Sequence, residues 1–206
     1  MSLATKYRTV KNITEGQYRE KGSKFLAFVI PCDNSADAKN HVDQLWKKHP
    51  GAVHVCYAWR FGKKKMEERF SDDGEPSNTA GKPIFGQILA FDLTNVLIAV
   101  VRYYGGTNLG VGGLIQAYKT AAKEALDQAL IIEQALVDFY KIQFAFDQTG
   151  DVMNLLQRRH VNISAQDYSE HGTIVHFSIA QNQASFLAGD FEHLPNIIFE
   201  KTGSDT

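Results

Sequence analysis

The sequence predicts an α+β protein of two domains, and two observations lead to this prediction. The elements expected in about the last 70 residues follow the order β-α-β-β-α-β, which is the ferredoxin-like split β-α-β pattern. The charge also changes sign along the chain, because residues 1–136 contain 18 Lys and Arg against 14 Asp and Glu, whereas residues 137–206 contain 4 against 9. We place the domains at 1–135 and 136–206. No Pro-, Gly- or Ser-rich linker separates them, so we expect a docked junction.

The elements of the N-terminal domain follow from hydrophobic patterning and punctuating residues. Gly16 and Gly22 lie beside two β-favouring stretches, and Ser35 is expected to cap a helix that ends before Pro50. The polar residues 62–82 are expected to form a long loop, and such loops in compact domains are usually functional or disordered. The expected strands are 7–15, 23–30, 53–61 and 96–101, and the expected helices are 35–49, 84–91 and 114–129.

The C-terminal domain shows clearer alternation of apolar and polar residues. The turn signal Glu170-His171-Gly172 separates two stretches with strand periodicity. Val152, Leu155 and Leu156 share one side of an expected helix. The expected strands are 137–146, 161–168, 173–180 and 197–200, and the expected helices are 151–160 and 181–194.

Composition excludes several classes of protein. No uninterrupted apolar run approaches the ~18 residues of a membrane span, and residues 1–6 lack the apolar core of a secretion signal. Cys32 and Cys56 are too few for a disulfide scaffold or a four-thiolate zinc site. A cytoplasmic location is therefore expected. The net charge of −1 does not by itself indicate nucleic-acid binding.

A glycine-rich stretch follows the expected buried strand that ends at Arg102. Backbone N–H groups of glycines can approach a ligand closely, and the start of a helix leaves unpaired donors with positive dipole character, a design suited to anions. The spacing matches neither the Walker A loop nor the dinucleotide fingerprint. A tight strand-to-helix turn would explain the glycines equally well, so both interpretations stay open. The candidate anion-binding residues are Arg102, Tyr103, Gly105, Gly106, Gly110, Gly112 and Gly113.

An acidic cluster precedes this stretch, at Ser71, Asp72, Asp73 and Glu75. Three carboxylates within four residues could hold Mg²⁺ or act as general acids and bases. Alternatively, the acids stabilise a structured loop by capping N–H groups or by pairing with arginines. We favour the structural interpretation, because no nucleophile–base pair is evident nearby. We expect Asp72 or Asp73 to pair with Arg60 or Arg102, and we predict no catalytic residue, metal or cofactor.

Basic residues supply a possible surface for phosphate groups. Three successive lysines could simply form a solvated turn, or could join other cations in a basic face for a nucleic-acid backbone. The candidates for this face are Lys21, Lys24, Arg60, Lys63, Lys64, Lys65, Arg69 and Arg102.

His54 and Cys56 fall on the same side of an expected strand, as a metal-binding or nucleophilic pair would require. Two ligands are too few for zinc, and no group that would activate the thiol is evident. We therefore interpret Cys56 as a buried packing residue.

Several long motifs, in the order found in the family, resemble the IMPACT/YigZ family over residues ~1–135, and the remainder resembles the second domain of its bacterial two-domain members. These motifs are Glu20-Lys21-Gly22-Ser23-Lys24-Phe25, His54-Val55-Cys56-Tyr57-Ala58-Trp59-Arg60, Arg69-Phe70-Ser71-Asp72-Asp73-Gly74-Glu75-Pro76, Thr79-Ala80-Gly81-Lys82-Pro83, and the stretch from Arg102 to Gly113.

This resemblance implies an N-terminal α+β domain with the fold of elongation factor G domain IV and of the second domain of a small-subunit ribosomal protein. It implies a C-terminal domain like elongation factor G domain V. The eukaryotic relative is a translational regulator that binds the activator of a starvation kinase, and nucleic-acid or ribosome binding is the usual inference for bacterial members. Family members commonly carry Arg where this chain has Gln116, which removes one candidate phosphate contact.

Three functions are consistent with these observations. We rank first a non-catalytic, translation-linked regulator that binds RNA, the ribosome or a translation factor through the basic, glycine-rich N-terminal domain. The second is an enzyme acting on a phosphorylated or peptide substrate through Asp72, Asp73 and Glu75. The third is a protein-interaction adaptor.

Overall fold

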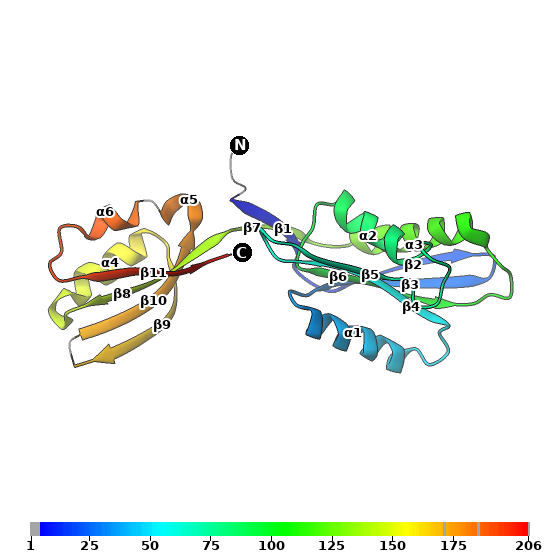
Figure 1. Ribbon diagram of the computed structural model, residues 1–206, viewed down its shortest axis with the longest axis horizontal. Coiled ribbons are helices and arrows are strands. Elements are labelled where there is room, and N and C mark those ends of the chain that lie inside the picture. Colours follow the sequence, from blue (N-terminus) through cyan, green and yellow to red (C-terminus); the bar gives the residue numbers. More distant parts are fainter. Residues whose placement is uncertain (1–4, 171, 185, 206) are drawn as a thin grey trace. The chain divides into compact units, whose positions relative to one another are not determined.

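The computed structural model describes residues 5–170, 172–184 and 186–205. The chain forms two compact units (Figure 1). The first unit is Tyr7–Gln134, and the described residues of the second are 5–6 and 135–205. In the described part of the chain, no helix combines the length and the apolar character needed to cross a lipid bilayer.

The first unit is built on a five-stranded antiparallel sheet with the order β2-β3-β6-β4-β5. One helix covers one face of this sheet and two helices cover the other (Figure 1). Strands β1 and β7 form a separate two-stranded sheet. The strands are β1 (Lys6–Val10), β2 (Thr14–Glu20), β3 (Ser23–Pro31), β4 (His54–Phe61), β5 (Glu67–Ser71), β6 (Val96–Tyr103) and β7 (Ile131–Ala135), and the helices are α1 (Ser35–Lys48), α2 (Gly81–Ala90) and α3 (Gly110–Asp127).

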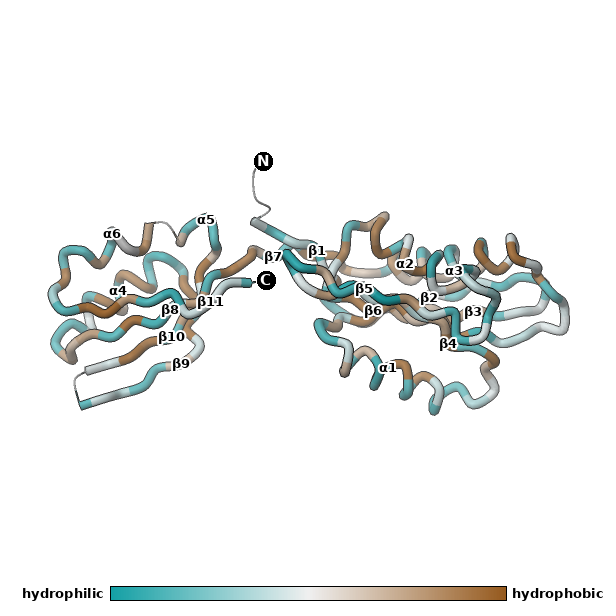
Figure 2. Tube along the Cα trace, in the orientation of Figure 1, coloured by the Kyte–Doolittle hydropathy of each residue, from teal (hydrophilic) through white to brown (hydrophobic). Residues whose placement is uncertain are grey.

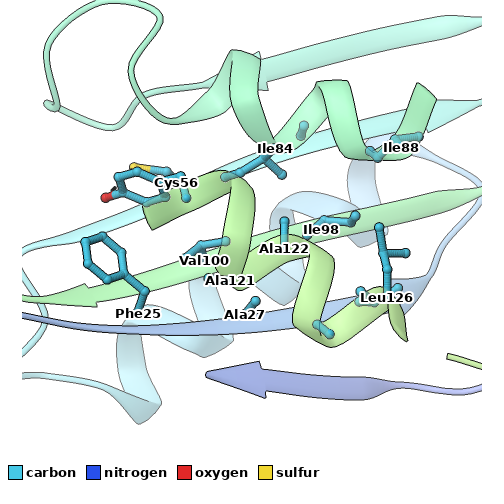
Figure 3. Close-up of a cluster of buried hydrophobic side chains, with 14 of the residues drawn as sticks. Phe25, Ala27, Cys56, Ile84, Ile88, Ile98, Val100, Ala121, Ala122 and Leu126 are labelled. Atoms are coloured by element: carbon cyan, nitrogen blue, oxygen red, sulfur yellow. Dashed lines mark hydrogen bonds between the residues drawn. The ribbon is translucent and has the colours of Figure 1, made fainter. Parts of the chain in front are cut away.

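Strand β6 is buried on both faces, as its continuous apolar run predicts. Ile98 and Val100 point toward α2 and α3 (Figure 3), whereas Leu97 and Val101 point toward α1. Hydrophilic and hydrophobic residues alternate along α1 (Figure 2), because this helix has one apolar stripe against the sheet and one exposed face. The side chain that caps α1 is Asn34, which accepts from the Asp37 N–H, rather than the expected Ser35.

The predicted first strand, 7–15, is in fact two strands with different partners. β1 pairs with β7, and β2 pairs with β3. Gly16, expected to end a strand, lies within β2. Glycine is required there because a Cβ would come within 2.3 Å of the Ala125 backbone nitrogen of α3. Local sequence does not show this requirement, since it arises from the helix that packs across the strand.

The stretch predicted as a loop, 62–82, contains strand β5 and the start of α2. β5 lies at the edge of the sheet and its residues are mostly exposed, so it carries no apolar alternation to identify it. α2 begins at Gly81 rather than 84 and has Pro83 in its first turn. Proline is tolerated there because N–H groups of the first turn make no hydrogen bond within the helix. α3 begins at Gly110 rather than 114, so three of the glycines lie in its first turn.

The second unit is a four-stranded antiparallel sheet with the order β11-β8-β10-β9. This sheet order and the element order agree with the predicted split β-α-β pattern. Its core includes Ile142, Val152, Val175 and Phe177. The elements are β8 (Val137–Phe144), the 3-10 turn η1 (Phe146–Gln148), α4 (Thr149–Arg158), β9 (Asn162–Ser169), β10 (Gly172–Ala180), α5 (Gln181–Ala184), α6 (Leu187–Phe191) and β11 (Ile198–Ser204).

The helix predicted over 181–194 differs in the structure, and one residue of the predicted turn is outside the described range. The single helix expected over 181–194 is two short helices, α5 and α6, and α6 turns Leu187 and Phe191 into the core. His171, the middle residue of the predicted turn, lies outside the described residues.

Candidate functional site

A cleft with a volume of about 500 Å³ lies at one end of the five-stranded sheet in the first unit. Strand register sets its position, because His54 at the start of β4 pairs directly with Arg102 near the end of β6. The first turn of α3 and the loop that precedes α2 complete the walls. The lining residues are Val53, His54, Glu75, Pro76, Arg102, Tyr104, Asn108, Leu109, Gly110, Val111 and Leu114.

The N-terminus of α3 opens onto this cleft without a side-chain cap. Leu109 occupies the N-cap position and has no polar side chain, and no acidic residue lies in the first turn. The N–H groups of the first turn therefore lack the side-chain partners that usually satisfy them. Together with the dipole of this 18-residue helix, they create a positive potential at the cleft.

The glycines beside the cleft serve different purposes. At Gly105 a Cβ would lie 1.9 Å from the Gly22 carbonyl carbon, so backbone packing requires glycine. Gly106 and Gly110 have φ values of +83° and +72°, which disfavour other residues. Gly112 has neither restriction, because its φ is not positive and a Cβ there would meet nothing within 4 Å. The strand-to-helix turn thus explains some of the predicted glycines but leaves Gly112 unexplained.

Arg102 forms a buried ion pair at the floor of the cleft. Its Nη1 donates to Glu75 Oε1 at 2.5 Å, and the Tyr118 hydroxyl donates to the same oxygen at 2.7 Å. Only 6% of Arg102 and 8% of Glu75 are exposed to solvent. The guanidinium also lies 5.5 Å from the Phe25 ring centroid and 5.6 Å from that of Tyr104. A charge removed from water in this way is stable only with its partner in place.

Two nitrogens of Arg102 make no hydrogen bond with the part of the chain that the structure describes. Nε is buried and makes no hydrogen bond among the described residues. Nη2 makes none with the described residues either, since Nη1 carries the only hydrogen bond of this side chain there. The cleft therefore contains an arginine whose charge is paired but whose donors are not all used.

His54 lies beside this ion pair. Its Nδ1 is 2.7 Å from the Asp73 carbonyl oxygen, and because a carbonyl only accepts, Nδ1 carries the proton. Its Nε2 lies 3.9 Å from Glu75 Oε1. The predicted shared face of His54 and Cys56 is present, since the Cys56 thiol donates to the neighbouring Asp72 carbonyl. Burial raises the pKa of Cys56, so this thiol is a packing group rather than a nucleophile.

The prediction that Asp72 or Asp73 pairs with Arg60 or Arg102 is wrong. The Asp72 carboxylate accepts the N–H groups of Asn78, Ala80 and Gly81 instead. The Asp73 carboxylate accepts the Val55 N–H at 2.6 Å, and its own N–H donates to the Ser71 hydroxyl. Of the acidic cluster, Glu75 alone lines the cleft as the structure describes it.

The remaining predicted basic residues lie in several places. Lys24 pairs in β3 with Tyr103 at the end of β6, on the α1 face of the sheet rather than on the face that carries the cleft. Lys63, Lys64 and Lys65 follow the other end of β4, about 20 Å from His54 at roughly 3.3 Å per residue.

Arg60 and Arg69 make contacts away from the cleft. Arg60 binds Glu68 and the Leu93 carbonyl, and Arg69 on β5 lies over the Trp59 ring. The basic candidates therefore do not form one continuous face.

Sequence reasoning missed several residues of the cleft. Tyr118 lies within an apolar helical stripe, where nothing distinguishes a hydrogen-bonding tyrosine from a packing one. Tyr104, Asn108 and Val111 fall within the recognised glycine-rich stretch, and their place between its glycines is the signal that the sequence offers. Glu75 was recognised, but its pairing with Arg102 depends on how the loop folds.

Comparison with known proteins places this site in a family context. The family model of the Impact N-terminal domain matches residues 21–126, which include the whole cleft. The IMPACT family member YigZ of Escherichia coli (strain K12) is 35% identical over 150 residues, which are 72% of this chain and 74% of that protein. The "Protein IMPACT homolog" of Saccharomyces cerevisiae is 32% identical over 96 residues, which are 44% of this chain and 36% of that protein.

A solved structure is similar to nearly the whole chain. The crystal structure of a hypothetical protein superposes with a TM-score of 0.73 and 28% sequence identity, and covers 96% of this chain and 97% of that one. The similarity therefore includes both units.

Proposed function

Because this chain belongs to the IMPACT family, we propose that it is a non-catalytic, translation-linked regulator whose first unit binds RNA, free or within the ribosome, in the cytoplasm. The link to translation rests on the family motifs. The observation that carries RNA binding is the cleft, where Arg102 and the uncapped N-terminus of α3 converge. Both features favour the phosphate oxygens of a nucleic-acid backbone.

Charge distribution supports the same proposal. The region 1–136 has an excess of four positive charges, and the region 137–206 has an excess of five negative charges. RNA is expected to contact the first unit and to be repelled by the second. Lys63, Lys64 and Lys65 form a separate basic turn that adds phosphate contacts away from the cleft.

Recognition in this arrangement depends on phosphate rather than on base edges, because the chain carries no base-reading motif. The affinity is expected to be modest, insensitive to sequence and steeply dependent on salt. Three or four phosphate contacts to a single strand correspond to a slope of log K against log salt of roughly −2 to −3.

The test is fluorescence anisotropy of labelled single-stranded RNA with the full chain across a salt series. Replacing Lys63, Lys64 and Lys65 by Gln should weaken binding and make the slope shallower. The matched control replaces Lys39, Lys47 and Lys48 by Gln, which removes the same charge from α1. Absence of binding at low salt would reject RNA as the ligand and favour docking on a translation factor through protein contacts.

The family motifs also lead us to propose specific fold relatives, namely elongation factor G domain IV for the first unit and domain V for the second. Superposition of experimental structures of each unit on those domains tests this.

A further inference from the structure

We infer that the cleft binds one unpaired nucleotide, with its phosphate at Arg102 and the α3 N-terminus and its base against Tyr104. This inference deepens the proposed RNA binding and rests on it, because it specifies which part of an RNA strand enters the cleft. Four properties of the cleft carry it: its unused donors, its bare backbone, its apolar walls and its unused acceptors.

The donors come from two independent sources. Arg102 is more than nine-tenths buried and lines the cleft, and its Nη2 makes no hydrogen bond within the described structure, whereas Nε is too deeply buried to meet a ligand. The first turn of α3 adds N–H groups with no side-chain cap. Arginine donors combined with helix N–H groups match the several acceptor oxygens of a phosphate.

Gly110 leaves the backbone at the start of α3 bare where it lines the cleft. With no Cβ at this residue, an incoming group can approach the first N–H groups of the helix closely. Gly112 lies in the same turn but outside the cleft lining, and no positive φ and no close contact requires glycine there.

The walls of the cleft are apolar and suit a planar base. Tyr104 is 48% exposed at the rim, and Val111 is 59% exposed. Leu109, Leu114 and Val53 also line the cleft. Aromatic side chains stack on any base without reading its edges. The volume of about 500 Å³ is typical of sites for small ligands.

The acceptors distinguish a nucleotide from a bare anion. Glu75 Oε1 receives both hydrogen bonds to this carboxylate, so Oε2 has no donor among the described residues. In the neutral tautomer with its proton on Nδ1, His54 offers Nε2 as a second acceptor. Hydroxyl groups of a ribose can donate to these atoms, whereas inorganic phosphate at neutral pH offers few donors and is repelled by Glu75. Unpaired nucleotides fit better than a duplex, whose bases are stacked inside.

The test is isothermal titration of the full chain with adenosine 5′-monophosphate, inorganic phosphate and adenosine. We expect the monophosphate to bind at least about tenfold more tightly than either fragment, since it uses both halves of the cleft. If adenosine or phosphate alone binds as tightly as the monophosphate, the inference is wrong.

Substitution of Val111 tests the phosphate half. An acidic residue in the first turn favours the helix, so Val111→Asp should fold normally while repelling phosphate. Because both variants remove the same apolar wall residue, binding of the monophosphate to Val111→Asp should be about tenfold or more weaker than binding to the neutral Val111→Asn, whose side chain has the same shape as that of Asp. Equal binding by the two variants would contradict a phosphate at this helix terminus.

Substitution of Tyr104 tests the base half. Loss of one stacking contact reduces binding by roughly 5- to 150-fold, so Tyr104→Leu should weaken the monophosphate to nearly the affinity of inorganic phosphate. Tyr168→Leu removes another exposed tyrosine, in the second unit, and should have no effect. Thermal melts of all four variants verify folding.

The same proteins, titrated with labelled single-stranded RNA, separate the two proposals. If RNA binds but the monophosphate does not, and Val111→Asp leaves RNA binding unchanged, the nucleotide inference fails and RNA binding stands. If the monophosphate binds but RNA does not, the proposed function fails while the nature of the cleft ligand is established. A short peptide with a free C-terminal carboxylate is the competing ligand. If this peptide binds more tightly than the monophosphate, and if Val111→Asp weakens its binding, the nucleotide assignment is wrong.

Discussion

Arg102 and Glu75 are 27 residues apart in the sequence and form a buried ion pair with a 2.5 Å contact between Nη1 and Oε1. The pair joins the end of β6 to the loop before α2, and Tyr118 adds α3 through its hydrogen bond to Glu75. Three elements that meet at the cleft are therefore held by one carboxylate. This arrangement explains how a polar site persists at the edge of an apolar core.

Glu75→Gln should destabilise the first unit strongly. Removing one charge of a buried pair leaves the other unpaired, which costs about 3–5 kcal/mol. Urea unfolding measures the change. The control Glu68→Gln removes a half-exposed partner of Arg60 and should cost less than about 1 kcal/mol. Similar losses in the free energy of unfolding for both variants would show that the buried Arg102–Glu75 pair stabilises the fold no more than the half-exposed Arg60–Glu68 pair.

Asp72→Ala should also destabilise the first unit, although no arginine pairs with Asp72 among the residues described. Its carboxylate accepts three backbone N–H groups at and before the start of α2. Loss of a capping side chain costs about 0.5–2 kcal/mol. Asp43→Ala, an exposed change on α1, is the control for chemical denaturation. An unchanged midpoint for Asp72→Ala would mean that this carboxylate is free for another role.

Stability of the second unit should depend on Asp138 at acidic pH. Burial alone would raise the pKa of this carboxyl, but hydrogen bonds, above all from Lys201 Nζ at 2.8 Å, lower it overall. Because the folded pKa lies below the unfolded value of about 3.9, the stabilisation is complete above that pH and disappears as pH falls through the folded pKa. Asp138→Asn should therefore be less stable than the natural chain at neutral pH.

The difference between the unfolding free energies of these two proteins should narrow at a pH below the unfolded value of about 3.9, because the stabilisation from the Asp138 charge is lost as pH falls toward the folded pKa. Urea unfolding at both pH values, followed by circular dichroism, measures this. A difference that stayed constant with pH would show that the Asp138 charge is not the source of the effect.

Gln116→Arg should strengthen RNA binding if the first unit binds phosphates beside α3. Gln116 is exposed and hydrogen-bonds only to Thr120 among the described residues, so an arginine fits without repacking. One additional contact should make the salt slope steeper by about 0.7. Gln44→Arg adds the same charge on α1, at the opposite face of the sheet. An equal gain from both variants would indicate a general charge effect.

A fragment of residues 135–206 should fold by itself. Its sheet and helices enclose their own apolar core, formed by residues of β8, β10, α4 and α6. Thermal melts by circular dichroism should show one cooperative transition. A gradual, featureless melt would show that this unit needs the rest of the chain to fold.

Sequence alone determined the elements that have a strong local pattern. The apolar run of β6, the alternation of β8 and β10 and the element order of the second unit were predictable, because side-chain periodicity reports burial directly. The motifs from Arg102 to Gly113 and around His54 also identified the family. The glycine-rich stretch also marked one wall of the cleft. Glycines just before the start of a helix indicate a tight turn or an anion site, and this signal lies within a short segment of sequence.

Only the tertiary structure decided which residues meet. The sequence predicts a loop where the edge strand β5 lies, because an exposed strand has no apolar face and depends on β4 for its hydrogen bonds. Charge pairing was assigned to Asp72 and Asp73, but folding of the loop brings Glu75 to Arg102 instead. Ion pairs depend on distances between atoms, which sequence separation does not determine. Register along β4 likewise places the lysine turn at one end of the sheet and the cleft at the other.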